Sequence, residues 1–467
     1  MRRSRGGGDM REAIENGPAP GARRWAWLAR WAPLVVFALA LPGQWLLLAN
    51  PGYFSHDELQ WAAFAGRDGP IAWSSWTAID AFQYRPLTFN LWLWLSRQLF
   101  AQPQAFHLLL VVWGAGNAAL ACALARRFGV ATGPAIAGAL VFALGPFAAY
   151  THGWVGTLGD LLWLSCALLA GLAVARTRRP ALAAAAAIAC PALGLLAKEA
   201  AAAIPLLLAL AWAFDGRKRT WAAATVAASA VLVAYLALRI GVLLHAPREG
   251  TQYALGAGHV PLRWLEYQLF AFVPTVFETF NTLSRGLDGR IVVAAALWLT
   301  LLATLWRSAP RLAALFLLGG LAALAPVLPL GSSWNHYGYG FAALTAPVVA
   351  AAWPRAPRWG RAVIALAAVL CLWHGANVMR TLRHVGQVQA VFSPALAQAV
   401  AAQARPGHSA PLRLRPAADA EGWIFARLTH DIPEYDGVAI GPRVQLVAAG
   451  AAAELEIAAD GRLHPAR

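Results

Sequence analysis

Long apolar runs recur along almost the whole chain and restrict it to one class of fold. Each run is rich in Ala, Leu, Val and Trp and is long enough to cross a bilayer core of about 30 Å as a helix. Helices are expected because the lipid interior offers no partner for backbone N–H and C=O groups. The chain is 59% hydrophobic and 13% charged, which is more apolar than a soluble domain of 467 residues requires. About eleven spans are predicted, near residues 31–49, 105–125, 131–150, 157–175, 181–197, 200–214, 220–243, 291–306, 312–330, 339–353 and 362–379.

The positive charge of the chain follows these spans. The formal net charge is +16, and the basic residues fall in alternate connections. These are Arg126-Arg127, Arg176–Arg179, Arg217–Arg219, Arg307 with Arg311, and Arg355–Arg361. The alternation is the positive-inside pattern, and it accounts for the charge without a nucleic-acid partner.

The same pattern predicts an orientation in the membrane. Arginines from Arg2 to Arg30 precede the first span and hold that end in the cytoplasm. An odd number of spans then places the C-terminus on the opposite face. We therefore expect a multi-pass protein of a bacterial inner membrane, with a cytoplasmic N-terminus and a periplasmic C-terminus. The opening segment lacks a convincing small-residue cleavage site and is not expected to be a cleavable signal peptide.

The predicted fold class is an all-α polytopic membrane protein with a small C-terminal α+β soluble domain. Residues 1–30 are expected to be a disordered basic tail, and 31–380 the transmembrane domain with outer segments 50–104 and 244–290. The C-terminal domain, 381–467, is expected to begin with a helix from Val385 to Ala404. Strand-like stretches follow at 411–415, 422–428, 444–447 and 455–457.

The first outer segment is expected to lie at the membrane surface. Amphipathic helices are predicted at 58–66 and 87–99. A cluster of tryptophans is expected to anchor the segment at headgroup depth. They are Trp61, Trp73, Trp76, Trp92 and Trp94.

An acidic pair, Asp57–Glu58, follows the first span on the face opposite the basic N-terminus. Two adjacent carboxylates beside His56 suit a base that takes a proton from an acceptor hydroxyl. The same stretch also suits the start of a helix, with Ser55 and Asp57 near its N-terminus. Considered alone, the pair favours the helix start, because isolated carboxylates are common and catalytic ones are rare.

Further ionisable residues lie at the ends of spans on the same predicted face. They are Arg85 in Tyr84–Leu87, Asp160 inside the fourth span, Lys198-Glu199 at a tight turn, and His336-Tyr337 before the tenth span. Each has a structural alternative. Arg85 can reach lipid phosphates, Asp160 can cap its helix, and Lys198 can pair with its neighbour Glu199. The aromatic stretch around His336 can form an interfacial belt.

Taken together, these residues predict a site. Cations at one membrane face can hold a phosphate, and a carboxylate among them can activate a nucleophile. A divalent metal is not required, because no carboxylate cluster is dense enough, and no other cofactor is indicated.

The motifs resemble those of the GT-C superfamily of polytopic glycosyltransferases, especially the protein O-mannosyltransferase-like and tetratricopeptide-linked transmembrane branches. The resemblance covers about the first 340 residues in order. The matching stretches are His56–Glu58, Tyr84–Asn90, Phe106–Leu108, Gly156–Leu162, Leu196–Glu199 and, less closely, Asn335–Tyr337. Two departures stand out: no arginine precedes Asp160 in its motif, and Asn335-His336 stands where the family has an acid–arginine pair. The region 381–467 matches no part of the family.

The resemblance implies transfer of a sugar from a polyprenyl-phosphate carrier, with inversion, to a glycan, lipid or protein acceptor. It implies Asp57 as the general base, with Glu58 sharing that role or orienting the acceptor. Arg85, Lys198 and His336 would stabilise the departing lipid phosphate. The remaining substrate-binding residues would be His56, Asp160, Glu199 and Tyr337.

Two other classes of function fit the same features. A flippase or other transporter of lipid-linked sugars would also need many helices and buried charges. Transporters, however, place charges near the bilayer midplane and often show two related halves. A non-catalytic membrane scaffold, whose C-terminal domain binds a partner, is the third alternative.

Overall fold

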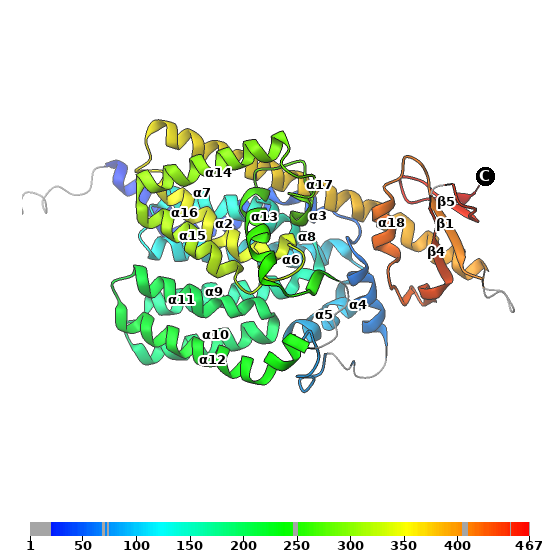
Figure 1. The fold of residues 1–467 in the computed structure, drawn as a ribbon, viewed down its shortest axis with the longest axis horizontal. Helices are drawn as coiled ribbons and strands as arrows, with labels where there is room; N and C mark the ends of the chain where they lie inside the picture. The colour runs from blue at the N-terminus through cyan, green and yellow to red at the C-terminus, as the bar shows by residue number, and fades with distance from the viewer. Residues whose placement is uncertain are drawn as a thin grey trace, which may run out of the picture.

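A long helical bundle with a small sheet at one end makes up the protein (Figure 1). The computed structural model describes residues 20–67, 71, 74–245, 251–403, 410–448 and 450–466. The helices up to the middle of the chain are α2 Pro20–Gly43, α3 Trp45–Leu48, α4 His56–Gly66, α5 Pro86–Leu99, α6 Pro103–Arg127, α7 Thr132–Leu144, α8 Pro146–Gly153, α9 Leu158–Arg176, α10 Pro180–Ala197, α11 Ala203–Phe214 and α12 Lys218–His245. The remaining ones are α13 Val260–Phe270, α14 Gly289–Ser308, α15 Pro310–Leu324, α16 Tyr339–Ala352, α17 Arg358–Gln403 and α18 Gly422–Thr429. Several begin at a proline, whose fixed φ and missing N–H suit the first helical position.

Six helices in the described part of the chain are long and apolar enough to cross a membrane. They are α6, α9 with the turn before it (Val155–Arg176), α10, α12, α14 and α17. The pair α7 and α8 passes the same test but bends by 52° at its break. Shorter apolar helices span Ala29–Gly43, Glu199–Phe214 and Pro310–Leu324. These helices are those of a multi-pass membrane protein; a helix occupies each predicted range, but eleven crossings stay a prediction.

The basic clusters all lie at one kind of connection. They fall at the short turns α6–α7, α9–α10, α11–α12, α14–α15 and α16–α17. Several of the candidate site residues lie at the other ends of the same helices. Asp160 is in the first turn of α9, Lys198 follows α10, and His336 precedes α16. One end of the bundle therefore carries the basic turns, and the other end carries candidate site residues.

The first helix starts earlier than expected. α2 begins at Pro20, so residues 20–30 are helical rather than part of a disordered tail. The proline at the first helical position and the Ala- and Arg-rich sequence after it both favour helix here. Residues 1–19 of the predicted tail lie outside the described residues.

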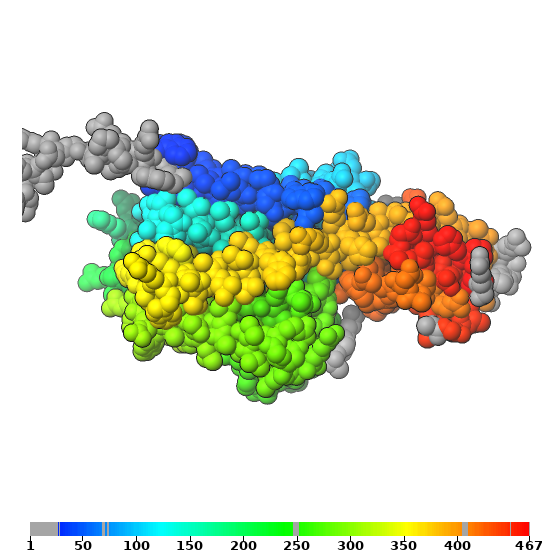
Figure 2. Space-filling model, turned by 90° about the horizontal axis from the view of Figure 1, so that it is seen from above, coloured from blue at the N-terminus to red at the C-terminus, as the bar shows by residue number. Residues whose placement is uncertain are grey.

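The last membrane helix and the C-terminal segment are continuous. α17 has 46 residues, about 70 Å at 1.5 Å per residue, which is more than twice the thickness of a bilayer core. It runs from the bundle to the C-terminal segment along one side of the molecule (Figure 2). The predicted boundary at 380/381 falls inside this helix.

A four-stranded sheet forms the core of the C-terminal segment, in the order β4-β1-β5-β6. Its strands are β1 Leu412–Pro416, β4 Val444–Leu446, β5 Leu455–Ile457 and β6 Leu463–Pro465, and a small hairpin pairs β2 Glu434–Tyr435 with β3 Val438–Ala439. β1 is parallel to β4 and β5, and β6 is antiparallel to β5. Strands thus lie at three of the four predicted stretches.

The fourth predicted strand, 422–428, is wrong, because this stretch forms helix α18. Its buried residues are Ile424, Phe425 and Leu428, which is a helical spacing rather than the alternation of a strand. Phe425 packs on Phe392 of α17, with ring centroids 5.0 Å apart. The helix is therefore held by the end of α17.

Both helices predicted in the first outer segment are present, as α4 and α5, but two of the tryptophans expected to anchor it at headgroup depth are buried. Trp61 and Trp92 are buried and stack on each other, with ring centroids 4.1 Å apart. They join α4 to α5 instead of anchoring at headgroups, because stacking removes both rings from solvent. Trp76 and Trp94 are exposed, and Trp73 lies outside the described residues.

Candidate functional site

One cavity of about 720 Å³ collects most of the predicted site residues. The residues that line it include His56, Asp57, Arg85, Lys198, His336 and Tyr337. They come from α4, the start of α5, the end of α10 and the turn before α16, which are far apart in sequence. Glu58, Asp160 and Glu199 do not line the cavity; each lies behind a residue that does.

The carboxylate side of the cavity is formed by the first turn of α4. Asp57 Oδ1 lies 3.4 Å from Nε2 of His56, and the two side chains are 30% and 27% exposed. The second ring nitrogen of His56, Nδ1, lies 3.2 Å from Oγ of Ser55. Burial raises the pKa of Asp57, while the neighbouring His56, Arg427 and His430 oppose that rise. A raised pKa brings a carboxylate closer to the range that suits a general base.

Glu58 has a structural role in this helix start. Its Oε2 accepts a hydrogen bond from the backbone N–H of Ser55 at 2.6 Å, and its Oε1 accepts one from Val155 at 3.1 Å. The side chain is 2% exposed, and burial raises its pKa to about 8. Glu58 therefore fixes the start of α4 against the turn before α9, as a residue at the third helical position can.

The cationic side of the cavity consists of Arg85 and Lys198, and each has a carboxylate partner. Lys198 Nζ donates to Oδ2 of Asp160 at 2.5 Å, and Arg85 Nε donates to Oε2 of Glu199 at 2.8 Å. The expected alternative, a pair between the neighbours Lys198 and Glu199, is therefore wrong. Within the described residues, Nε is the one nitrogen of Arg85 with a hydrogen-bond partner, so its two terminal nitrogens are available to a ligand.

Close packing brings these elements together. The hydroxyl of Thr88 on α5 donates to the carbonyl oxygen of Ala197, the last residue of α10, at 2.7 Å. A side chain at Gly159 would begin only 3.1 Å from that carbonyl oxygen and 3.2 Å from the Thr88 hydroxyl. The glycine thus allows the first turn of α9, with Asp160, to approach Lys198.

His336 lies beside these two cations within an aromatic surround, and burial together with the charges of Lys198 and Arg85 lowers its pKa, so its ring is neutral. Its ring lies 5.3 Å from Trp154 and 4.3 Å from Tyr337, measured between centroids. The side chain is more than nine-tenths buried, and its Nδ1 has no hydrogen-bond partner among the described residues. Lys198 Nζ lies 5.0 Å above the ring of Tyr337. A buried unpartnered nitrogen in a cavity wall is a feature that a polar ligand can satisfy.

The C-terminal segment contributes residues that the sequence did not point to. Arg427 and Asp431 line the same cavity, and so does Tyr253 from the second outer segment. Arg427 Nη2 donates to Oε1 of Glu278 at 2.7 Å. No short motif marks these residues; the helical spacing within 422–428 is the one signal that could have placed Arg427 on a different face of α18 from Ile424, Phe425 and Leu428.

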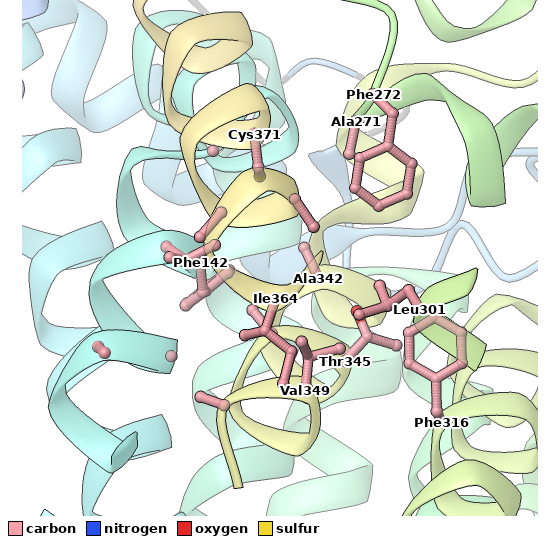
Figure 3. A pocket seen from close by; sticks show the side chains of 18 of the residues that line it. Phe142, Ala271, Phe272, Leu301, Phe316, Ala342, Thr345, Val349, Ile364 and Cys371 are labelled. Carbon is pink, nitrogen blue, oxygen red and sulfur yellow. The ribbon is translucent and has the colours of Figure 1, made fainter. Parts of the chain in front are cut away.

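A second cavity, of about 400 Å³, lies inside the bundle. Apolar side chains of α7, α14, α15, α16 and α17 line it, with Ala271 and Phe272 after α13 (Figure 3). Phe142, Leu301, Phe316 and Ile364 are among them. Its lining carries no Asp, Glu, His, Lys or Arg, so it suits a hydrocarbon chain rather than a reacting polar group.

Within the described residues, no three His, Cys, Asp or Glu side chains are grouped closely enough to hold a metal ion. No family model, curated protein or solved structure matches the chain. What the site does must therefore be inferred from its own chemistry.

Proposed function

We propose that the protein is an inverting membrane glycosyltransferase. It moves a hexosyl or pentosyl group from a polyprenyl-phosphate carrier to an acceptor hydroxyl of a glycan, lipid or protein. The observation that supports this proposal is the shared cavity, whose lining includes the carboxylate of Asp57 beside His56 and the cations Arg85 and Lys198. A base and a phosphate-binding group in one cavity are the two elements that this transfer needs.

Asp57 serves as the general base in this proposal. It accepts the proton of the acceptor hydroxyl as that oxygen forms a bond to the anomeric carbon. The bond between the anomeric carbon and the phosphate oxygen breaks, and its electron pair leaves with the polyprenyl phosphate. Attack from the side opposite the leaving group inverts the anomeric centre. His56, 3.4 Å from Asp57, orients the carboxylate.

Arg85, Lys198 and His336 bind the phosphate of the donor. The terminal nitrogens of Arg85 can contact two phosphate oxygens, while Lys198 acts as a point charge. Charge grows on the leaving phosphate in the transition state, so cations fixed beforehand by Glu199 and Asp160 lower the barrier without reorganising. Tyr337 holds the ammonium of Lys198 from the ring side.

The membrane placement follows the same proposal. The basic turns face the cytoplasm of a bacterial cell, and the cavity faces the periplasm. The hydrocarbon chain of the donor lies between helices, and the apolar cavity within the bundle offers room for hydrocarbon.

The test is to incubate the purified full-length protein with polyprenyl-phosphate-linked glucose, mannose, galactose and arabinose, one at a time. We expect release of polyprenyl phosphate from at least one donor. Asp57→Asn should reduce that release by about a hundredfold or more, the usual scale for a general base. Asp288→Asn is the matched control, because Asp288 caps α14 through backbone N–H groups that asparagine can also bind.

Three results would contradict the proposal. Equal release by Asp57→Asn and the unchanged protein would remove the catalytic assignment. Movement of donor across proteoliposomes without any release or transfer would instead identify a transporter. Absence of both release and transport, with loss of binding to a partner protein on deletion of the C-terminal segment, would favour the scaffold.

A further inference from the structure

The C-terminal segment packs on the exposed face of α4, where the candidate base lies. Gln60 Nε2 donates to the backbone oxygen of Asp431 at 2.7 Å, and the rings of His56 and His430 are 4.9 Å apart. In Figure 1, α18 lies between α4 and the C-terminal sheet. The segment therefore forms one wall of the cavity rather than a separate module.

Helix α18 has two faces with different partners. Ile424, Phe425 and Leu428 are buried toward the end of α17 and the C-terminal core. Trp423 and Arg427, four residues apart, lie on another face. The ring of Trp423 lies 6.1 Å from that of Phe277 in the second outer segment. The helix thus links the C-terminal core to the cavity.

Arg427 is fixed at this wall by three contacts. Its Nη2 donates to Glu278, its guanidinium lies 4.4 Å from the ring centroid of Phe54, and Trp423 lies 6.0 Å away on its own helix. The side chain is 16% exposed and lines the cavity together with Asp57. Phe54 precedes the first turn of α4, so the contact ties Arg427 to the element that carries the base.

We propose that the C-terminal segment is the outer wall of the active cavity and that Arg427 is a positioning residue, which stabilises the ionised carboxylate of Asp57. The proposal rests on the proposed function for the step in which Asp57 accepts a proton. Arg427 acts through Asp57 and needs no contact with the sugar.

The charges around Asp57 make Arg427 the strongest fixed positive charge on it. An opposite charge nearby favours the ionised form of a carboxylate. A guanidinium keeps its charge at every pH of such an assay, which an imidazole does not. The titratable and charged groups around Asp57 are His56, Glu58, Tyr150, Tyr253, Arg427, His430 and Asp431. Glu278 compensates part of the charge of Arg427.

Two substitutions should act in opposite directions. Arg427→Gln removes the positive charge, so Asp57 should ionise at a higher pH. Glu278→Gln removes the compensating negative charge, so Asp57 should ionise at a lower pH. Arg427→Lys keeps the charge, so Asp57 should ionise close to the pH at which it ionises in the unchanged protein. The matched control is Arg415→Gln, since Arg415 is also paired with a glutamate in the C-terminal segment, is similarly exposed at 19%, and is not among the lining residues.

The ionisation of Asp57 can be followed without any substrate. A water-soluble carbodiimide reacts with Asp57 in the full-length protein, and peptide mass spectrometry gives the extent of labelling at each pH. We expect the midpoint to rise by about one pH unit in Arg427→Gln and to fall in Glu278→Gln. In a donor assay, the acidic limb of kcat/KM should move in the same directions, with about a tenfold loss of rate on that limb for Arg427→Gln.

The outcomes separate this proposal from the proposed function. A labelling shift without any sugar transfer would keep the positioning role and remove the transferase assignment. Sugar transfer with an unshifted labelling midpoint in both Arg427→Gln and Glu278→Gln would overturn the positioning role alone. A uniform loss of rate at all pH values in Arg427→Gln, unrelieved by Arg427→Lys, would also overturn it. If Arg427→Gln fails to fold, the midpoint in Glu278→Gln decides.

Discussion

Replacing Asp160 by asparagine should be among the most damaging single changes in this bundle. Asp160 is 0% exposed and Lys198 5%, and their side chains are joined at 2.5 Å. Removing one partner of a buried ion pair leaves an uncompensated charge, which costs about 3–5 kcal/mol. Asparagine has nearly the same volume as aspartate and still offers an oxygen to the indole N–H of Trp163, so the lost stability comes from the lost charge.

The second ion pair sets the scale for this prediction. Arg85 and Glu199 are bonded at 2.8 Å, but their side chains are 19% and 24% exposed. Solvent reaches this pair, so Glu199→Gln should cost about 1 kcal/mol. The predicted loss of stability is therefore several-fold larger for Asp160→Asn than for Glu199→Gln, although both changes neutralise a carboxylate that lies behind a cation of the same cavity.

Unfolding of the purified protein in detergent, by titration with a denaturing detergent, measures both effects. The double variant Asp160→Asn/Lys198→Gln should regain most of the stability lost by Asp160→Asn alone, because no charge is left unpaired. Equal stabilities for Asp160→Asn and Glu199→Gln, or a double variant no more stable than Asp160→Asn, would refute the reasoning.

Three further outcomes are expected. Between the ordinary glutamate pKa and about 8, Glu58 is protonated in the folded protein and ionised in the unfolded chain, so the free energy of unfolding should fall as the pH rises through that window. Thermal midpoints should show this fall, and Glu58→Gln should flatten it. Glu199→Gln frees Arg85 from its carboxylate, so a donor-affinity measurement should give tighter binding of a polyprenyl-phosphate sugar, and weaker binding would place Glu199 itself on the donor. A reporter active only in the periplasm should be active when fused after Arg467, whereas activity of a cytoplasmic reporter there would break the odd number of spans.

The convergence of the site residues could be predicted from the sequence because it depends on periodic features. Apolar runs locate helices, and basic turns at alternate connections sort the helix ends into two sets. Asp160, Lys198 and His336 then belong to one set by position alone. The structure brings Lys198 and His336 to one cavity, with Asp160 directly behind Lys198.

The pairing of the charges could not be predicted in the same way. Adjacent residues such as Lys198 and Glu199 invite a local pair, but the backbone of Lys198 is extended, with φ −163° and ψ 142°. Side chains that follow one another on extended backbone point to opposite sides. Lys198 therefore meets Asp160 on α9, and Glu199 meets Arg85 at the start of α5. One backbone conformation at a helix end decides which carboxylate lies behind which cation.

The position of Arg427 beside the cavity could not be predicted from the sequence, for a different reason. It lies hundreds of residues from Asp57, on a short helix whose aromatic and apolar residues resemble a strand. Its position depends on the length of α17, which carries the C-terminal segment past the end of the bundle and back onto α4. No local pattern encodes the length at which a continuous helix ends beside a particular cavity.

The three arginine and lysine residues of the cavity share one property, and it bears on how a phosphate would bind. Arg85, Lys198 and Arg427 are each paired with a carboxylate that does not line the cavity. Charges at the edge of a membrane are tolerated when they are paired, so these partners allow the cations to stay fixed in place before any ligand arrives. The same carboxylates cancel much of the attraction for a phosphate in the ground state. They do so less for the larger charge that develops as the phosphate leaves, so the arrangement favours the transition state over tight binding of the donor.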